Sequence, residues 1–262
     1  MTTGIQADEF GARLKARELI KRLRIRRPED ISIEEIAWVA GAIVIDGGLR
    51  GAEARLVHSP GADKAILRVR GDVSPFGRRR FAIAHELGHL KLNHRAGAAT
   101  QCSETDFSAW YQGQKNQEVE ANIFASELLM PEDLVRAHLT RTLPGLEIVE
   151  RLANSFQTTL TASAIRYVEL CDEPCAVVYS SNQKVCWFRA NPLFRGWIRV
   201  GGPPSPNTHA SDYFTTGTAS EQMEVVRKDA WIDGASDRST IKEQSRAFPR
   251  YNSVLTILWA GD

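Results

Sequence analysis

The stretch RRRFAIAHELGHLKLNH, residues 78–94, decides how the rest of this 262-residue chain is interpreted. The pair Ser74-Pro75 before it is a common helix start, so the stretch predicts a helix that ends near residue 94. Residues four apart on a helix differ by only about 40° in direction, so His85 and His89 point to one side. Two imidazoles placed in this way can bind one ion, such as tetrahedral Zn²⁺.

Glu86 lies beside the first histidine without replacing a ligand. In the pattern His-Glu-x-x-His, a glutamate at this place takes a proton from a metal-bound water, the general-base role in metallopeptidases. The pattern also arises by chance on solvent-facing helices that bind no metal, so a third ligand has to decide. His94 is disfavoured for that role, because on a continuous helix it lies about 140° from His89. We expect His94 to be a helix-end residue.

A carboxylate on a second predicted helix, residues 116–129, is the favoured third ligand. Glu118 and Asn122 are four apart and share one face of that helix, whereas Glu120 points about 200° away from Glu118. A metal ligand is usually held by a hydrogen-bonding partner. The sequence therefore favours Glu118 as the ligand with Asn122 in support, and Glu120 is the alternative.

The whole chain predicts an α+β fold. Before residue 75, two helices and three β-branched runs indicate a small antiparallel sheet. After residue 174, the composition changes to strand-rich segments with loops between them. The predicted helices are 7–23, 32–39, 75–94, 116–129, 131–139, 146–156 and 160–170. The predicted strands are 41–47, 54–58, 64–69, two within 175–190, 226–233 and 253–260.

The composition excludes several classes of protein. Lys plus Arg number 33 and Asp plus Glu number 32, so the net charge of +1 gives no overall field that steers the chain to nucleic acid or to an anionic membrane. The longest largely apolar stretch, residues 36–45, is about half of the ~20 residues that cross a bilayer. The N-terminus lacks the pattern of a signal peptide. We therefore expect a soluble, cytoplasmic protein with no membrane partner.

The four cysteines are consistent with a reducing compartment. Cys171 and Cys175 are four residues apart, as two zinc ligands can be, but no second pair at finger-like spacing accompanies them. The other two are Cys102 and Cys186. The sequence therefore favours ordinary, partly buried cysteines.

Two motifs carry a resemblance to a known family. The stretch at residues 78–94, followed after about two dozen residues by EVEANIFASELLMP at 118–131, resembles the ImmA/IrrE family of bacterial metallopeptidases. The resemblance covers residues 10 to 140. The remainder is similar in layout to IrrE-type regulators. The whole resemblance implies three parts. The first is a zincin-like peptidase domain with the HExxH helix and a small sheet (1–140). It is followed by a helix-turn-helix-like segment (141–172) and a mixed α/β, GAF-like domain (173–262).

Carried onto this sequence, the resemblance implies that His85, His89 and Glu118 bind zinc and that Glu86 is the catalytic acid and base. Mn²⁺ or another divalent ion also suits two histidines and a carboxylate. Family members cleave helix-turn-helix repressors at a specific site and so induce stress-response or mobile-element genes. The resemblance therefore implies a protein substrate of this kind.

A transcriptional regulator that binds DNA directly, with a structural or vestigial metal site, is the second interpretation. The predicted helices 146–156 and 160–170 are separated by a short polar turn, as in a helix-turn-helix. The second helix carries Arg166 but also Glu169, which weakens its attraction for phosphate. The sequence therefore favours packing, or docking of a repressor, over operator binding.

Overall fold

The computed structural model describes residues 7–49, 51–57, 61, 63–94, 116–139, 143–236 and 239–261. The chain divides into two compact units, the N-terminal unit (1–135 with 153–159) and the C-terminal unit (136–152 with 160–262). The predicted division at 140/141 and 172/173 stays a prediction, as do the helix-turn-helix-like and GAF-like assignments. Within the described residues, no helix is both long enough and apolar enough to span a bilayer.

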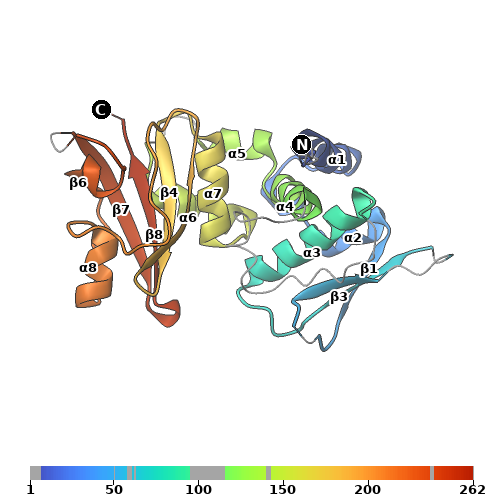
Figure 1. Cartoon of the computed structure of the whole chain (residues 1–262). Coiled ribbons are helices and arrows are strands. Elements are labelled where there is room, and N and C mark those ends of the chain that lie inside the picture. Colours follow the sequence, from blue (N-terminus) through green and yellow to red (C-terminus); the bar gives the residue numbers. More distant parts are fainter. Residues whose placement is uncertain are drawn as a thin grey trace, which may run out of the picture. The chain divides into compact units, whose positions relative to one another are not determined.

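Helices and strands combine in an α+β fold, as predicted (Figure 1). The helices are α1 (Glu9–Arg22), α2 (Ile33–Ala40), α3 (Phe76–Lys91), α4 (Asn116–Leu129), α5 (Glu132–Leu139), α6 (Leu146–Phe156), α7 (Leu160–Leu170) and α8 (His209–Thr216). The strands are β1 (Ala42–Asp46), β2 (Ala54–Val57), β3 (Ala65–Val69), β4 (Cys175–Ser181), β5 (Lys184–Ala190), β6 (Glu224–Arg227), β7 (Thr240–Phe248) and β8 (Ser253–Trp259). The predicted bounds of α4, α6 and α7 are confirmed.

The sheet of the N-terminal unit is mixed, so the prediction of an antiparallel sheet was wrong in one pair. Its order is β1-β3-β2. Strand β3 runs antiparallel to β2 but parallel to β1, with Val44 opposite Leu67. The apolar pattern of a strand shows which face is buried and not which strand lies beside it. The sequence therefore could not show that β3, and not β2, is the neighbour of β1.

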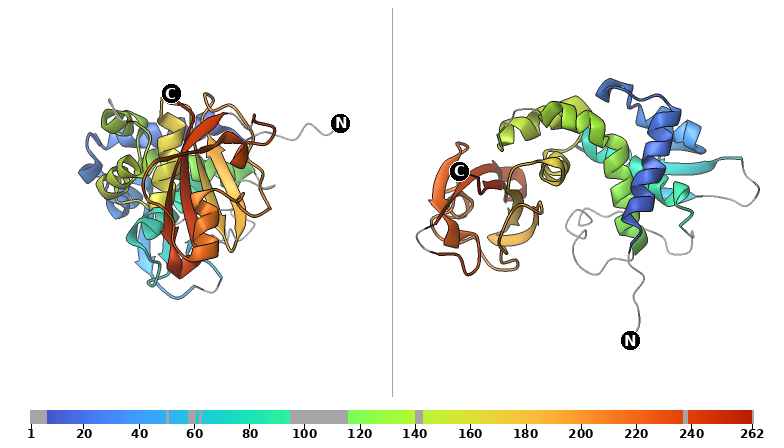
Figure 2. Two further views of the ribbon diagram at one scale, coloured as in Figure 1. Left: turned by 90° about the vertical axis from the view of Figure 1, so that its left-hand side faces the viewer. Right: turned by 90° about the horizontal axis from the view of Figure 1, so that it is seen from above.

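Close packing of α3 against α4 brings the two predicted motifs together. Helix α1 also lies alongside α4 (Figure 2), and Arg17 of α1 donates a hydrogen bond to the buried Glu127 of α4 at 2.9 Å. At the α3–α4 contact, a Cβ on Gly88 would lie 3.0 Å from both the Cα and the carbonyl oxygen of Ala121. Glycine at this position therefore permits the close approach of the two helices.

The C-terminal unit contains a five-stranded sheet in the order β5-β4-β8-β7-β6, with every pair antiparallel. Strand β7 was not predicted, because Glu243, Gln244 and Ser245 are buried polar residues that obscure its apolar pattern. Glu243 accepts a hydrogen bond from the indole N–H of Trp231 at 2.8 Å, which offsets the cost of burying the carboxylate. The predicted strand 226–233 was wrong after Arg227, where a short 3₁₀ turn follows.

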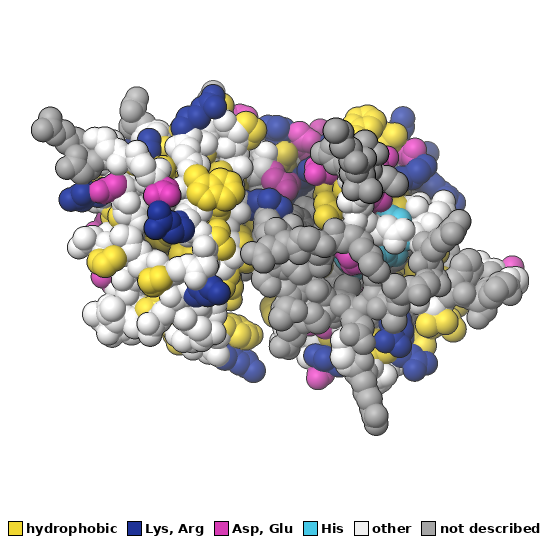
Figure 3. Space-filling model, in the orientation of Figure 1, with side chains coloured by type: hydrophobic (Ala, Val, Ile, Leu, Met, Phe, Trp, Pro, Cys, Tyr) yellow, Lys and Arg dark blue, Asp and Glu magenta, His cyan; other side chains and the backbone are white. Residues whose placement is uncertain are grey.

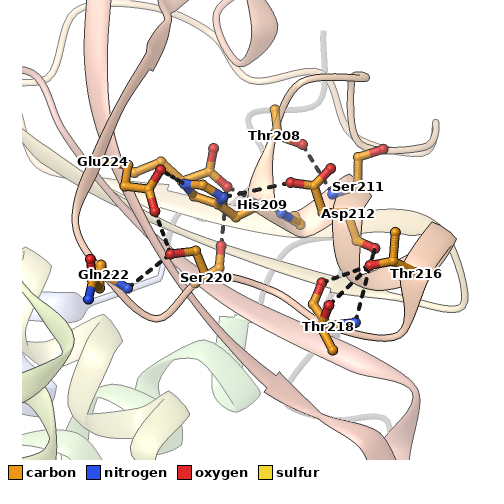
Figure 4. Close-up of polar contacts among 12 residues, drawn as sticks. Thr208, His209, Ser211, Asp212, Thr216, Thr218, Ser220, Gln222 and Glu224 are labelled. Carbon is orange, nitrogen blue, oxygen red and sulfur yellow. Dashed lines mark hydrogen bonds and ion pairs between the residues drawn. The ribbon is translucent and has the colours of Figure 1, made fainter.

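Helix α8 was also missed, because its first residue follows a segment rich in Pro and Gly. Thr208 caps the helix, since its hydroxyl accepts a hydrogen bond from the Ser211 N–H at 3.1 Å. The imidazole of His209 lies 3.8 Å from the carboxylates of Asp212 and of Glu224, at the start of β6 (Figure 4). This cluster connects α8 to the edge of the sheet.

Candidate metal centre

Helix α3 places His85 and His89 on its buried side, one turn apart. Their exposed fractions are 3% and 6%. The two Nε2 atoms are 3.0 Å apart, and the rings meet edge to face. Both imidazoles therefore present the same nitrogen to one point, as the four-residue spacing predicts.

Glu118 of α4 faces the same point. Its Oε2 lies 3.2 Å from His85 Nε2 and 3.6 Å from His89 Nε2. A tetrahedral ion with bonds of about 2.0–2.1 Å keeps its ligand atoms roughly 3.3 Å apart, so the three observed separations fit a divalent cation. In the part of the chain that the structure describes, this is the one group of three or more His, Cys, Asp or Glu residues that could hold a metal ion.

The charge of Glu118 is favoured by its surroundings. Burial acts to raise the pKa of its carboxyl, but hydrogen bonds and charges from His85 and His89 outweigh burial and lower that pKa. The carboxylate is therefore ionised at neutral pH. One carboxylate oxygen and two imidazole nitrogens are a ligand set that Zn²⁺ accepts once the imidazoles have lost the Nε2 protons.

Asn122 contacts His85. The spacing had instead predicted that Asn122 supports Glu118. The Oδ1 of Asn122 lies 2.8 Å from His85 Nδ1, with both side chains buried. An amide oxygen only accepts, so Nδ1 of His85 carries a proton, and a bound metal would take the lone pair of Nε2.

Behind His89, His94 and Glu120 take the place that Asn122 has behind His85, and they form a chain of hydrogen bonds. His94 Nδ1 lies 2.9 Å from His89 Nδ1, and His94 Nε2 lies 2.9 Å from Glu120 Oε2. For His89 to present the lone pair of Nε2, its proton must lie on Nδ1 and be donated to His94. His94 then donates its own Nε2–H to Glu120. Burial lowers the pKa of His94, which favours the neutral imidazole that this chain requires.

The contact between His94 and His89 was not predicted, because the prediction assumed a helix that continues to residue 94. Helix α3 ends earlier, at Lys91. Asn93 has a positive φ of 55°, and the N–H of His94 donates to the carbonyl of His89 at 3.0 Å. This is the pattern of a Schellman turn, which folds the chain back over the last turn of the helix. Asparagine after the last apolar residue of the helix was the feature of the sequence that could have predicted it.

Glu86 is buried beside the cluster and is held from the sheet. Its Oε2 accepts a hydrogen bond from the N–H of Leu56, in β2, at 3.0 Å. Burial raises the pKa of the Glu86 carboxyl, although the neighbouring histidines and the Leu56 N–H oppose the rise. A carboxylate with a raised pKa is better matched to accepting and returning a proton near neutral pH. In the space-filling view, histidine and acidic side chains are both seen at the surface on the right-hand side (Figure 3).

Comparisons with known proteins agree with this geometry. Residues 50–167 match the model of the IrrE N-terminal-like domain, a span that contains both motifs. The radiation response metalloprotease IrrE of Deinococcus radiodurans is 27% identical over 198 aligned residues, which cover 66% of this chain and 56% of that protein. The alignment thus spans little more than half of that relative.

A solved structure shares the fold. The Mycobacterium tuberculosis transcriptional regulator superposes with a TM-score of 0.60 over 95% of this chain and 87% of that chain. The two sequences are 15% identical, so this likeness concerns the fold alone. The domain match and the IrrE relative together support the predicted resemblance of this chain to the ImmA/IrrE family of metallopeptidases.

Proposed function

We propose that this protein is a zinc-dependent endopeptidase that cleaves a helix-turn-helix transcriptional repressor at one site, and so induces a stress-response or mobile-element regulon. The observation that carries the proposal is the convergence of His85, His89 and Glu118 with Glu86 beside them. The name of the Deinococcus relative, a radiation response metalloprotease, supports both the reaction and the link to stress.

The residues of the chain suit peptide hydrolysis. A divalent ion held by His85, His89 and Glu118 would polarise the peptide carbonyl and lower the pKa of a bound water toward ~7. Glu86 accepts the proton of the attacking water and then returns it to the leaving amine. Burial keeps this carboxylate away from bulk water, while the N–H of Leu56 fixes its orientation.

Strand β2 offers a place for the substrate backbone. It is an edge strand of the sheet, and the N–H of Leu56 points to Glu86. An extended peptide can add to such an edge through main-chain hydrogen bonds. A peptide bound along β2 would have its backbone beside the Glu86 carboxylate.

The test is a comparison of the wild type with Glu86→Gln on a panel of purified helix-turn-helix repressors. We expect one new N-terminus by mass spectrometry with the wild type and a rate at least about 100-fold lower with the variant. Elemental analysis should find one zinc per chain in both proteins. Glu35→Gln, an exposed change on α2, is the matched control and should cleave normally. Cleavage by Glu86→Gln at the wild-type rate would overturn the proposal.

A second candidate is direct DNA binding, since the solved structure with the same fold is a transcriptional regulator. The structure weakens it at one position. Arg166 of α7 is fully buried and forms an ion pair with Glu169 at 3.1 Å, so this cation is not presented to phosphate. A gel shift with an operator duplex is the test, because this candidate requires salt-dependent binding by the protein alone.

A further inference from the structure

The turn between α7 and β4 has a cysteine at each end, and one side chain contacts both. The N–H of Cys171 donates to the carbonyl of Tyr167 at 2.8 Å, at the end of α7, while Cys175 begins β4. Asn191 holds both ends of the turn. Its Nδ2 donates to the Cys171 carbonyl at 3.0 Å, and its Oδ1 accepts from the Cys175 N–H at 3.4 Å. The turn is therefore anchored at both cysteines by one side chain.

The two sulfur atoms have different environments. Cys175 is fully buried, and its Sγ lies 3.9 Å from Asn191 Nδ2, the atom that donates to the Cys171 carbonyl. Cys171 is half-buried, and its Sγ also lies 3.3 Å from the hydroxyl of Tyr167 and 3.4 Å from the N–H of Glu173. A backbone N–H and a hydroxyl thus lie beside one sulfur that solvent can reach.

This arrangement suits Cys171 to be the nucleophile and Cys175 to be the resolving thiol. The hydrogen bond from Cys175 lowers the pKa of Cys171 to about 6, against the effect of burial and with help from Tyr167 and Glu173. The same hydrogen bond and burial raise the pKa of Cys175, which stays protonated. Burial also raises the pKa of Tyr167, so its hydroxyl remains a donor. Only a thiolate attacks an oxidant, so the two cysteines have separate roles.

A metal site does not account for the pair. A structural zinc site has four protein ligands. Among the residues that the structure describes, the groups that could hold a metal do not include Cys171 or Cys175. A pair of adjacent thiols without further ligands is suited to forming a disulfide instead.

We propose that Cys171 and Cys175 form a redox-active dithiol that hydroperoxides oxidise to a disulfide. In the first step the Cys171 thiolate attacks the peroxide, an S–O bond forms, the O–O bond breaks, and the hydroxide released takes a proton to leave as water. In the second step the Cys175 sulfur attacks the sulfenic acid, the S–S bond forms, and a second water leaves with the thiol proton. Two thiols and one hydrogen peroxide thus give one disulfide and two waters.

The first test is oxidation of the full-length protein with one equivalent of hydrogen peroxide, followed by peptide mapping. We expect the peptide or peptides that carry Cys171 and Cys175 to lose two hydrogens, and a reductant to restore them. Cys171→Ser should leave Cys175 unmodified, whereas Cys175→Ser should leave a sulfenic acid on Cys171 that dimedone traps. The Cys186→Ser control should behave as the wild type. Mapping also separates any reaction at Cys102, which lies outside the described residues.

The second test measures the pH dependence of iodoacetamide labelling at each cysteine, with circular dichroism to check folding. We expect Cys171 to label with a midpoint near pH 6, and Cys186, whose pKa burial raises, to label well above that pH. Cys175→Ala should move the Cys171 midpoint upward by about one unit or more, because it removes the main donor. Tyr167→Phe keeps the ring and should produce a smaller upward shift.

Two results would overturn the proposal. One is hydrogen peroxide oxidising Cys186 as fast as Cys171 with no crosslinked peptide. The other is a Cys171 labelling midpoint that stays the same in folded Cys175→Ala and Tyr167→Phe. Neither result bears on the proposed peptidase, which can be assayed on the same samples.

Discussion

Two pairs of side chains that can bind metals share a spacing of four residues in this protein and meet in different ways. His85 and His89 lie one turn apart on α3, where helical geometry alone aligns them. Cys171 and Cys175 lie at the two ends of a turn, where Asn191 holds the backbone. Equal spacing therefore brings each pair together through a different structural element.

Each pair faces a third side chain, and this side chain determines which chemistry the pair can perform. The histidines face the carboxylate of Glu118, which supplies a negative charge and an oxygen ligand. Cys171 faces the hydroxyl of Tyr167, which lies 3.3 Å from its sulfur and can donate to the thiolate form. A spacing in sequence thus predicts proximity, and the group that faces the pair decides between metal binding and redox chemistry.

The largest expected effect is the loss of metal binding in Glu118→Ala. We expect one divalent ion per chain in the wild type and at least a 100-fold weaker affinity in the variant, because even partners behind a ligand contribute about 10- to 100-fold. Competition with a chromophoric zinc chelator measures the affinity. The double variant Cys171→Ser/Cys175→Ser should bind zinc as the wild type does. Full affinity in Glu118→Ala, or its loss in the double cysteine variant, would contradict the comparison.

The sequence predicted the helices of this fold better than its sheets. Helices α4, α6 and α7 have the predicted bounds, since each is followed by residues that favour a turn. Strand β7 was missed because its buried side chains include Glu243, whose partner Trp231 lies outside that strand. The pairing of β1 was wrong because strand neighbours depend on the path of the chain. Long-range partners were therefore the part that local patterns could not provide.

The second largest effect is expected behind the histidine ligands. His94→Phe removes the acceptor of the His89 proton, and Glu120→Gln removes the charge at the end of the chain. We expect zinc affinity to fall by about 10-fold or more in the first variant and by less in the second. Because the two residues act through one chain, the double variant should be less than additive.

The matched control is His138→Phe, which changes a histidine of α5 outside the ligand set and should leave zinc affinity unchanged. Equal affinities for the wild type and His94→Phe would show that His94 does not hold His89. Strict additivity of the two changes would show that they act separately.

The candidate site was predictable as far as the helices reached. His85, Glu86 and His89 followed from one helix, and Glu118 followed from the face it shares with Asn122. His94 was excluded as a neighbour because a continuous helix was assumed, whereas α3 ends at Lys91. Side chains beyond a helix end follow the geometry of the cap and no longer that of the helix.

The smallest expected effect tests this cap. Asn93 adopts a left-handed conformation, which costs alanine roughly 1 kcal/mol or more and glycine almost nothing. We therefore expect Asn93→Ala to lower the free energy of unfolding by about 1 kcal/mol in urea, and Asn93→Gly to preserve it. If the turn also keeps His94 in place, the alanine variant should bind zinc roughly two- to fivefold more weakly, because a smaller fraction of molecules has the complete site. The glycine variant should bind as the wild type does, since its turn is intact. Equal zinc affinities in the two variants, with only the alanine variant less stable, would mean that packing against Glu120 and His89, and not the turn, positions His94.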